Sequence, residues 1–179
     1  MILVVSAYPD ESIEADGAME RIAIVDMVLA GHSRAYLDIS LKGHIFPEWE
    51  EVSPGVIVHR VNLFLHFWYI LSIAAKASMV YVHSVPNALR VLPLYLSFPI
   101  VTDLSLTGGA ADGGPLWKLA QLVAHHKSKA LVLDVGAEVP RVAGLRMFRA
   151  AEPASKESKA LAAFVTKDEP EVKPAHPVR

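Results

Sequence analysis

The sequence predicts one α/β domain with a doubly wound, mostly parallel sheet of about six strands and helices on both faces. Three observations support this fold class. The chain has 179 residues, a length that suits a single domain. Short apolar runs rich in β-branched residues alternate with segments of helical periodicity. The runs are apolar on both sides, which is typical of strands covered by helices on both faces.

Each expected strand is a short apolar run that ends at polar or turn-forming residues. The first run, for example, is followed by Tyr8, Pro9 and Asp10. Runs of this kind lie at 2–7, 35–39, 56–61, 80–85, 100–104 and 130–135. Parallel strands joined in this way need crossover connections, which we expect to be right-handed.

The segments between these strands predict helices. Apolar residues recur at spacings of four and three from position 18 to 29, which places them on one helix face that ends at Gly31. Further helices are expected at 63–77, 87–98 and 115–126. Pro93 should kink or shorten the helix at 87–98, whereas Pro115 suits a first helical turn. The stretch 42–55 reads as a long connection.

The domain is expected to span residues 1–150, because the alternating pattern fails after Gly136. The remainder, 151–179, predicts a short helix followed by a tail rich in proline and charge. The apolar N-terminus is short and lacks preceding basic residues, so it predicts a buried strand and not a signal peptide. The longest apolar stretch, 63–75, is shorter than the roughly 20 residues of a membrane span.

Composition excludes several classes of function. Hydrophobic residues make up 53% of the chain and charged residues 20%, which excludes a disordered body. The net charge of −2 provides no basic field for a phosphate backbone, so nucleic acid is not an expected partner. Cysteine is absent, which excludes disulfides, thiolate metal sites and cysteine catalysis. We expect a cytoplasmic protein, with peripheral membrane contact left open.

Ligands of open α/β sheets bind beyond the carboxyl ends of the strands, where the strand order reverses. This rule selects polar residues that follow the first, fourth and fifth expected strands. His83 and Asp103 are the catalytic candidates, because imidazole and carboxylate groups act as general acids and bases. The substrate-binding candidates are Asp16, Gly17, Ser105 and Thr107.

Each candidate also has a structural interpretation. His83 is either functional or a buried structural histidine, and Asp103 either binds sugar hydroxyls or caps the amides of the following loop. The glycine-rich loop at 107–114 either holds an anion at a helix N-terminus or is a flexible connection. The helix at 63–77 either covers the sheet or contacts lipid.

Other ligand classes are excluded by the same positions. The loop after the first strand has a single glycine and four carboxylates, so it is unsuited to a dinucleotide pyrophosphate. A Walker phosphate loop and a hydrolase nucleophile elbow are absent. His125 and His126 are adjacent and point about 100° apart on a helix, so they do not form a chelating pair. We therefore expect no metal and no cofactor.

Several stretches resemble the N-terminal domain of retaining GT-B glycosyltransferases. The resemblance covers about residues 1–140 and rests on the order and spacing of the motifs. The stretches are 2–9 with Asp16-Gly17-Ala18-Met19-Glu20-Arg21, Leu29-Ala30-Gly31-His32, Pro54-Gly55-Val56-Ile57-Val58-His59-Arg60, Val80-Tyr81-Val82-His83-Ser84 and Pro99-Ile100-Val101-Thr102-Asp103.

The resemblance implies an acceptor-side domain in carbohydrate biosynthesis, Rossmann-like in fold. Such a domain takes a sugar from a nucleotide-sugar held by a second domain or partner chain, and passes it to a glycan or lipid-linked acceptor. It implies that His83 and Asp103 line the acceptor side and that the chain is inactive without the donor half. Many members have Asp-x-His where this chain has Asp103-Leu104-Ser105. The alternative is a binding module that keeps the fold without the chemistry, and association into homo- or hetero-oligomers is open.

Overall fold

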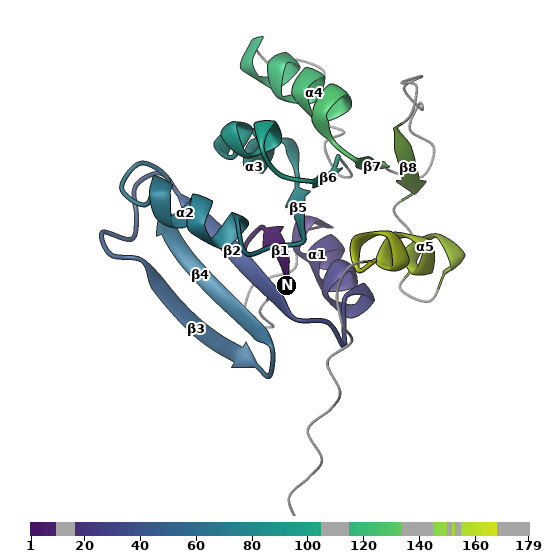
Figure 1. Ribbon diagram of the computed structural model, residues 1–179, viewed down its shortest axis with the longest axis horizontal. Helices are drawn as coiled ribbons and strands as arrows, with labels where there is room; N and C mark the ends of the chain where they lie inside the picture. Colours follow the sequence, from purple (N-terminus) through teal and green to yellow (C-terminus); the bar gives the residue numbers. More distant parts are fainter. Residues whose placement is uncertain (10–16, 105–114, 134–144, 150–151, 153–154, 168–179) are drawn as a thin grey trace, which may run out of the picture.

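The computed structural model describes residues 1–9, 17–104, 115–133, 145–149, 152 and 155–167. The described chain contains one sheet, whose strands form the centre of the molecule in Figure 1. The strands are β1 (Ile2–Val5), β2 (Arg34–Ser40), β3 (Glu48–Ser53), β4 (Val56–Asn62), β5 (Met79–His83), β6 (Ile100–Asp103), β7 (Ala130–Leu133) and β8 (Arg146–Arg149).

The strand order across the sheet is β3-β4-β2-β1-β5-β6-β7-β8. All pairings are parallel except that between β3 and β4, which is antiparallel. The central strands β4-β2-β1-β5-β6-β7 follow the order of a classic doubly wound sheet. The predicted α/β class with a mostly parallel sheet is therefore confirmed.

The predicted number of strands is wrong, because the sheet has eight strands and not about six. The two additional strands lie at its edges, where a strand needs less apolar sequence. β3 falls within the stretch expected to be a connection, and its residues 48–52 are all exposed. β8 lies beyond Gly136 and contains two arginines.

The helices lie between the strands along the chain, except the last one, which follows β8. They are α1 (Gly17–Val28), α2 (Phe67–Ala74), α3 (Val85–Arg90), the 3-10 helix η1 (Leu92–Leu96), α4 (Pro115–Lys127) and α5 (Lys156–Val165). The expected helix at 87–98 is thus divided into α3 and η1, and Pro93 lies in the first turn of η1. Proline is accommodated there because a first turn does not need its missing N–H.

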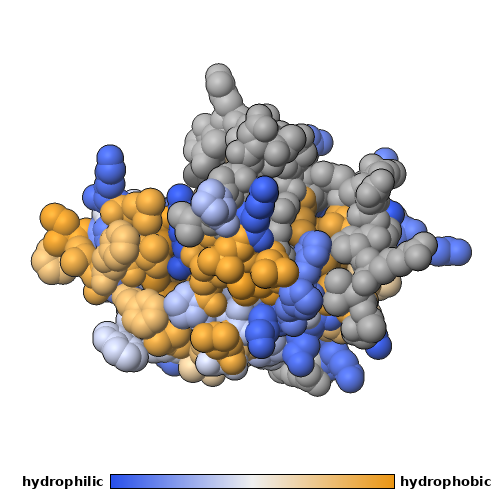
Figure 2. All heavy atoms as spheres, turned by 90° about the horizontal axis from the view of Figure 1, so that it is seen from above, coloured by the Kyte–Doolittle hydropathy of each residue, from blue (hydrophilic) through white to orange (hydrophobic). Residues whose placement is uncertain are grey.

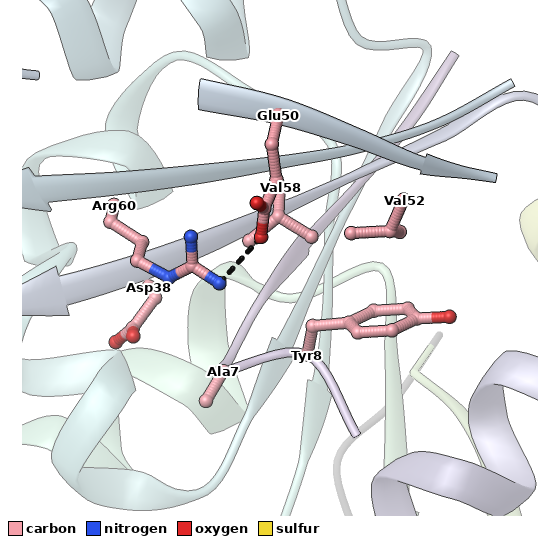
Figure 3. A pocket seen from close by; sticks show the side chains of 7 residues that line it. All are labelled: Ala7, Tyr8, Asp38, Glu50, Val52, Val58 and Arg60. Atoms are coloured by element: carbon pink, nitrogen blue, oxygen red, sulfur yellow. Dashed lines mark hydrogen bonds and ion pairs between the residues drawn. The ribbon is translucent and has the colours of Figure 1, made fainter. Parts of the chain in front are cut away.

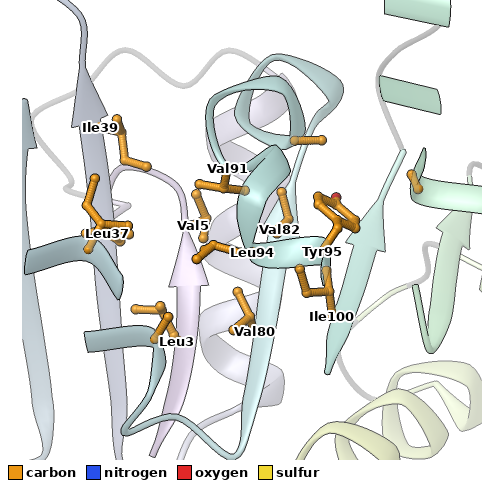
Figure 4. Packing of buried hydrophobic residues seen from close by; sticks show 14 of the residues in the cluster. Leu3, Val5, Leu37, Ile39, Val80, Val82, Val91, Leu94, Tyr95 and Ile100 are labelled. Atoms are coloured by element: carbon orange, nitrogen blue, oxygen red, sulfur yellow. The ribbon is translucent and has the colours of Figure 1, made fainter. Parts of the chain in front are cut away.

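Two clusters of buried apolar residues fill the interior, and alternate residues of each strand belong to one or the other. Leu3 and Val5 pack with residues of α2, α3, η1 and α4, as Figure 4 shows around Leu94 and Tyr95. Ile2 and Val4 belong to the second cluster, with residues of α1 and α5. This alternation follows from the two-residue period of a strand.

Candidate functional site at the carboxyl edge of the sheet

The strand order reverses between β1 and β5. From β1 the sheet continues through β2 and β4 on one side and through β5 and β6 on the other. The carboxyl ends of β1, β5 and β6 therefore meet at one edge, where His83 and Asp103 are paired in register as the last residues of their strands. This is the edge at which open α/β sheets bind ligands.

A buried polar cluster lies at this edge. Asp103 is fully buried, and its Oδ2 accepts a hydrogen bond from Arg21 Nε at 3.2 Å. The hydroxyl of Tyr81 donates a short hydrogen bond to the same oxygen. Arg21 comes from α1, so the cluster joins that helix to β5 and β6. A buried carboxylate needs such partners because desolvation otherwise disfavours its charge.

The electrostatics of the cluster stabilise a charged Arg21. Burial lowers the pKa of Arg21, but its attraction to Tyr81 and Asp103 outweighs burial and raises the pKa above its ordinary value. The pKa of Tyr81 is raised well above its ordinary value, first by burial and then by the charge of Asp103. Tyr81 therefore remains a protonated donor, and the cation opposite Asp103 is permanent.

The side chain of His83 is buried without a hydrogen bond to any described residue. Its side chain is 4% exposed, and neither ring nitrogen has a hydrogen-bond partner among the described residues. Nδ1 lies 3.6 Å from Asp103 Oδ2, which is within ion-pair range but too long for a hydrogen bond. Buried polar groups are usually satisfied, so an unsatisfied imidazole at a ligand-binding edge calls for a functional explanation.

The residue after His83 adopts a strained backbone conformation. Ser84 has φ 71° and ψ 154°, a region that residues other than glycine rarely occupy. Its N–H donates to the carbonyl oxygen of Asp103 at 2.9 Å, which connects the ends of β5 and β6. Strain of this kind persists where the surrounding structure enforces it, and it is concentrated at functional sites.

A pocket of about 280 Å³ lies on the other side of β1 from the buried polar cluster. It is lined by Ala7, Tyr8, Asp38, Glu50, Val52, Val58 and Arg60. Figure 3 shows Tyr8 and Val52 on one side and Arg60 and Asp38 on the other, with Glu50 and Val58 between them. The lining comes from β2, β3, β4 and the segment after β1, on the sheet face that carries α1.

The polar groups of the pocket have one internal ion pair. Arg60 Nη2 donates to Glu50 Oε1 at 2.7 Å across the β3–β4 pair. Asp38 stands on the adjacent strand β2, opposite Arg60 in register. Tyr8 packs edge-on against Tyr36, with ring centroids 5.0 Å apart. The pocket thus presents two carboxylates, one guanidinium and one aromatic ring to a ligand.

The structure describes three of the predicted site residues. It brings His83 and Asp103 together, and it places Gly17 at the first position of α1. Asp16, Ser105 and Thr107 lie outside the described residues. His83 and Asp103 are both buried, so each is a catalytic candidate that substrate could reach only after local movement.

Arg21, Tyr81 and the charged pocket residues were not among the sequence candidates. Arg21 had a detectable signal, because it lies three residues after Ala18 and four before Val25 and so shares the apolar face of its helix. A cation on such a face implies a buried anionic partner. The pocket has no comparable signal, because its members come from four separate segments.

Metal binding and membrane crossing find no support in the described part of the chain. No group of three or more His, Asp or Glu side chains is arranged there to hold a metal ion. None of the helices described is both long enough and apolar enough to cross a membrane.

No protein-family model matches the chain, and no curated protein matches it. Among solved structures, a similar one is described as "Trehalose-6-phosphate from E. coli bound with UDP-2-fluoro glucose". The two share 10% sequence identity with a TM-score of 0.47, over 83% of this chain and 48% of that chain. The chain thus spans about half the length of that structure. A likeness at this level carries no argument about function.

Proposed function

We propose that the chain is the acceptor-binding half of a retaining GT-B glycosyltransferase in cytoplasmic carbohydrate biosynthesis. It holds a glycan or a lipid-linked sugar at the carboxyl edge of its sheet, while a separate half holds the nucleotide-sugar donor. The observation that carries the proposal is the pocket over β2, β3 and β4, with its two carboxylates, its guanidinium and its tyrosine ring. The pocket supports sugar binding only. The transfer reaction is proposed because residues 1–140 resemble such enzymes.

The chemistry of the pocket fits a sugar ring. Sugar hydroxyls donate to the carboxylates of Asp38 and Glu50 and accept from the guanidinium of Arg60. The apolar face of a sugar packs on the ring of Tyr8 and on the two valines. The volume of about 280 Å³ lies at the small end of ligand pockets, which suits one ring better than a dinucleotide.

The buried cluster supplies different roles in this proposal. Asp103 is held by Arg21 and Tyr81, so it orients the edge of the sheet and balances charge. The ring nitrogens of His83 have no hydrogen bond among the described residues, so His83 is the group suited to exchange a proton with an acceptor hydroxyl. Retaining transfer depends on positioned charges more than on one strong base, so both roles are compatible with it.

Saturation-transfer NMR with glucose, mannose and myo-inositol tests sugar binding by the whole chain. We expect signals from at least one probe, weakened about tenfold in affinity by Asp38→Asn or Arg60→Gln, a loss of ~1.4 kcal/mol. Glu51→Gln is the matched control, because Glu51 lies on β3 next to Glu50 but pairs with Ile57 on the opposite face. Equal effects of all three variants, or no signal with any probe, would contradict the proposal.

The same chain should bind nucleotide-sugars weakly. The loop after β1 lacks the glycines that bring backbone amides to a pyrophosphate, and the pocket offers more carboxylates than cations. Calorimetric titration with UDP- and GDP-sugars measures this directly. Low-micromolar affinity for any of them would place the donor, and not the acceptor, on this chain.

A binding module without catalysis is the second candidate. It is favoured by the full burial of Asp103 and by its engagement with Arg21 and Tyr81, as expected of a structural carboxylate. This candidate predicts sugar binding by the pocket without any contribution of His83 to transfer. Turnover by the His83→Ala variant in the presence of a donor-binding half separates the two.

A further inference from the structure

The pocket over β2, β3 and β4 carries a negative charge that its own lining does not balance. Its charged lining residues are Asp38, Glu50 and Arg60. Arg60 Nη2 donates to Glu50 Oε1 at 2.7 Å, so these two charges neutralise each other. The carboxylate of Asp38 has no hydrogen bond or ion pair among the described residues, and Figure 3 marks no interaction for it. The net charge of the lining is therefore that of Asp38.

Asp38 is a partly buried carboxylate on β2, which lies between β1 and β4. Arg60 is opposite it in register on β4, yet the guanidinium of Arg60 pairs with Glu50 on β3. Solvent screens a partly buried charge less than an exposed one. A positive charge on a ligand is therefore attracted to Asp38 more strongly than to a surface carboxylate.

The buried cations on this face of the sheet do not supply the missing charge. Among the described residues, two buried arginines lie on the side that carries α1, and each already has a carboxylate: Arg21 pairs with Asp103, and Arg34 with Asp26. The sequence that follows the first strand adds only negative charge, because 10–16 contains four carboxylates and no lysine or arginine. The cation that suits Asp38 must therefore come from a ligand.

The remaining lining selects a small ring with an apolar face. Tyr8 and Val52 lie on the side of the pocket opposite Asp38 and Arg60 (Figure 3). The ring of Tyr8 is supported from behind by Tyr36, with centroids 5.0 Å apart. A ligand that fills the pocket thus meets a carboxylate at one end and apolar surface at the other, within a volume of about 280 Å³.

The exposed apolar surface elsewhere on the chain offers no such selection. Figure 2 shows hydrophobic residues gathered at the end of the molecule where α2 lies. Phe64 and Trp68, before and within α2, are 75% and 79% exposed, and neither carries a charge. Apolar side chains of this kind do not distinguish one partner from another, whereas an unbalanced carboxylate in a pocket selects a cation.

We propose that the sugar bound in this pocket is an amino sugar, whose ammonium group pairs with Asp38. The ammonium donates charge-assisted hydrogen bonds to the carboxylate, ring hydroxyls accept from Arg60, and the apolar face of the ring packs on Tyr8 and Val52. A sugar phosphate is unsuited, because its charge has the same sign as that of the lining. This inference rests on the proposed function and names the class of sugar within it.

NMR titration of the whole chain with matched sugars tests the inference. The probes are glucose, N-acetylglucosamine, glucosamine and 6-amino-6-deoxyglucose, which share a ring and differ in whether and where it carries an amine. At neutral pH we expect at least one of the two amines to bind about tenfold or more tightly than glucose, and N-acetylglucosamine no more tightly than glucose. The preference should disappear as the pH rises through the pKa of the ligand's amine.

Asp38→Asn should remove the preference and bring the affinity ratio of amine to glucose close to one. The variant should keep its unfolding temperature, because no hydrogen bond or ion pair of the Asp38 carboxylate is lost among the described residues. Glu51→Gln is the matched control, since Glu51 lies on β3 in register with Ile57 and does not line the pocket. Its affinity ratio should equal that of the unchanged chain.

The outcomes separate this inference from the proposed function. Equal binding of glucose and both amines overturns the inference and leaves sugar binding intact. A preference that persists in Asp38→Asn overturns the role of Asp38. Cyclohexylamine is the probe without hydroxyls, and its binding as tightly as the better amino sugar would overturn both the inference and the proposed function. So would the absence of binding by all four sugars.

Discussion

Arg21 and Asp103 are 82 positions apart in sequence, yet Arg21 Nε lies 3.2 Å from Asp103 Oδ2 with both side chains buried. The pair connects the first turns of α1 to the carboxyl end of β6. Because the two charges lie in a poorly solvated interior, each depends on the other. The pair therefore couples the stability of the domain to the geometry at the carboxyl ends of its central strands.

Removing Asp103 should destabilise the domain. In Asp103→Ala, Arg21 remains buried opposite Tyr81 without an anion, and such a loss costs about 3–5 kcal/mol. Chemical denaturation should show this as a lower unfolding free energy. Because the carboxylate is fully buried, its loss should affect stability whether or not it takes part in catalysis.

Glu50→Ala is the control for this comparison, since it removes an ion pair of 2.7 Å that is solvent-exposed. Exposed pairs contribute about 0–1 kcal/mol, so its effect should be small. The double variant Arg21→Met/Asp103→Leu removes both buried charges and should recover much of the loss. If Asp103→Ala were no more destabilising than Glu50→Ala, the buried pair would have no structural role.

Replacing the His83 side chain by an apolar ring should cost less stability than the same change at a histidine whose ring is hydrogen-bonded. Neither of its ring nitrogens has a hydrogen bond among the described residues, so His83→Phe removes an unsatisfied buried polar group. The unfolding free energy should be unchanged or higher by about 1 kcal/mol. If the proposed sugar transfer is right, turnover with a donor-binding half should fall at least about tenfold, ~1.4 kcal/mol of transition-state stabilisation.

His59→Phe provides the comparison, because His59 Nδ1 lies 3.0 Å from the hydroxyl of Tyr69. Loss of that hydrogen bond should lower the unfolding free energy by about 1 kcal/mol. A His83 variant that unfolds more readily than the His59 variant would assign His83 to structure. Normal turnover of a stable His83→Phe enzyme would exclude the proposed proton transfer.

The central strands are predictable from sequence because burial on both faces leaves a continuous apolar run, as in β1 and β5. β3 escapes this criterion, since an edge strand with three glutamates needs no apolar run. Its hairpin has a signal in Pro54 and Gly55, where Gly55 adopts φ 78° as a tight turn after proline requires. The Pro54-Gly55 turn therefore indicates a hairpin before β4. The three glutamates that precede the turn indicate a loop instead.

The site is only partly predictable because it combines local and distant signals. The rule of strand ends locates His83 and Asp103 correctly at one edge. It does not reveal that Arg21 occupies the space above Asp103, because that contact depends on how α1 crosses the sheet. Likewise, Asp38 and Glu50 come together only through the antiparallel addition of β3.

The tyrosines should ionise at a higher pH in the folded chain than in the unfolded chain. Burial raises the pKa of Tyr95 to about 12, partly offset by its hydrogen bond to Thr102. Burial likewise raises the pKa of Tyr36, Tyr69 and Tyr81. Absorbance at the phenolate band should therefore show few of the five tyrosines ionised at the usual pH of half-titration, whereas all should ionise in denaturant.

The raised tyrosine pKa values also determine whether the unfolding free energy rises or falls at alkaline pH. A phenol whose pKa is higher in the folded state holds its proton there after the unfolded chain has lost it. Its contribution to stability is complete below the ordinary pKa near 10 and declines as the pH rises from there toward 12. Tyr95→Phe should make this decline less steep. An unchanged slope in that variant, or full ionisation in the folded chain at the ordinary pKa, would contradict the buried positions.

Ser84→Gly should stabilise the domain and reveal whether the strain at the switch point serves a purpose. Serine at φ 71° and ψ 154° is strained by roughly 1–3 kcal/mol, and glycine occupies the same region without that cost. Glycine also has greater freedom in the unfolded chain, which reduces the gain, so we expect about 1 kcal/mol in the unfolding free energy. Ser97→Gly is the control, because Ser97 has φ −128° and should lose stability instead. If Ser84→Gly were also destabilising, the serine side chain would contribute a contact that outweighs the strain. If the variant gained stability and lost sugar binding, the strained turn would be part of the ligand site.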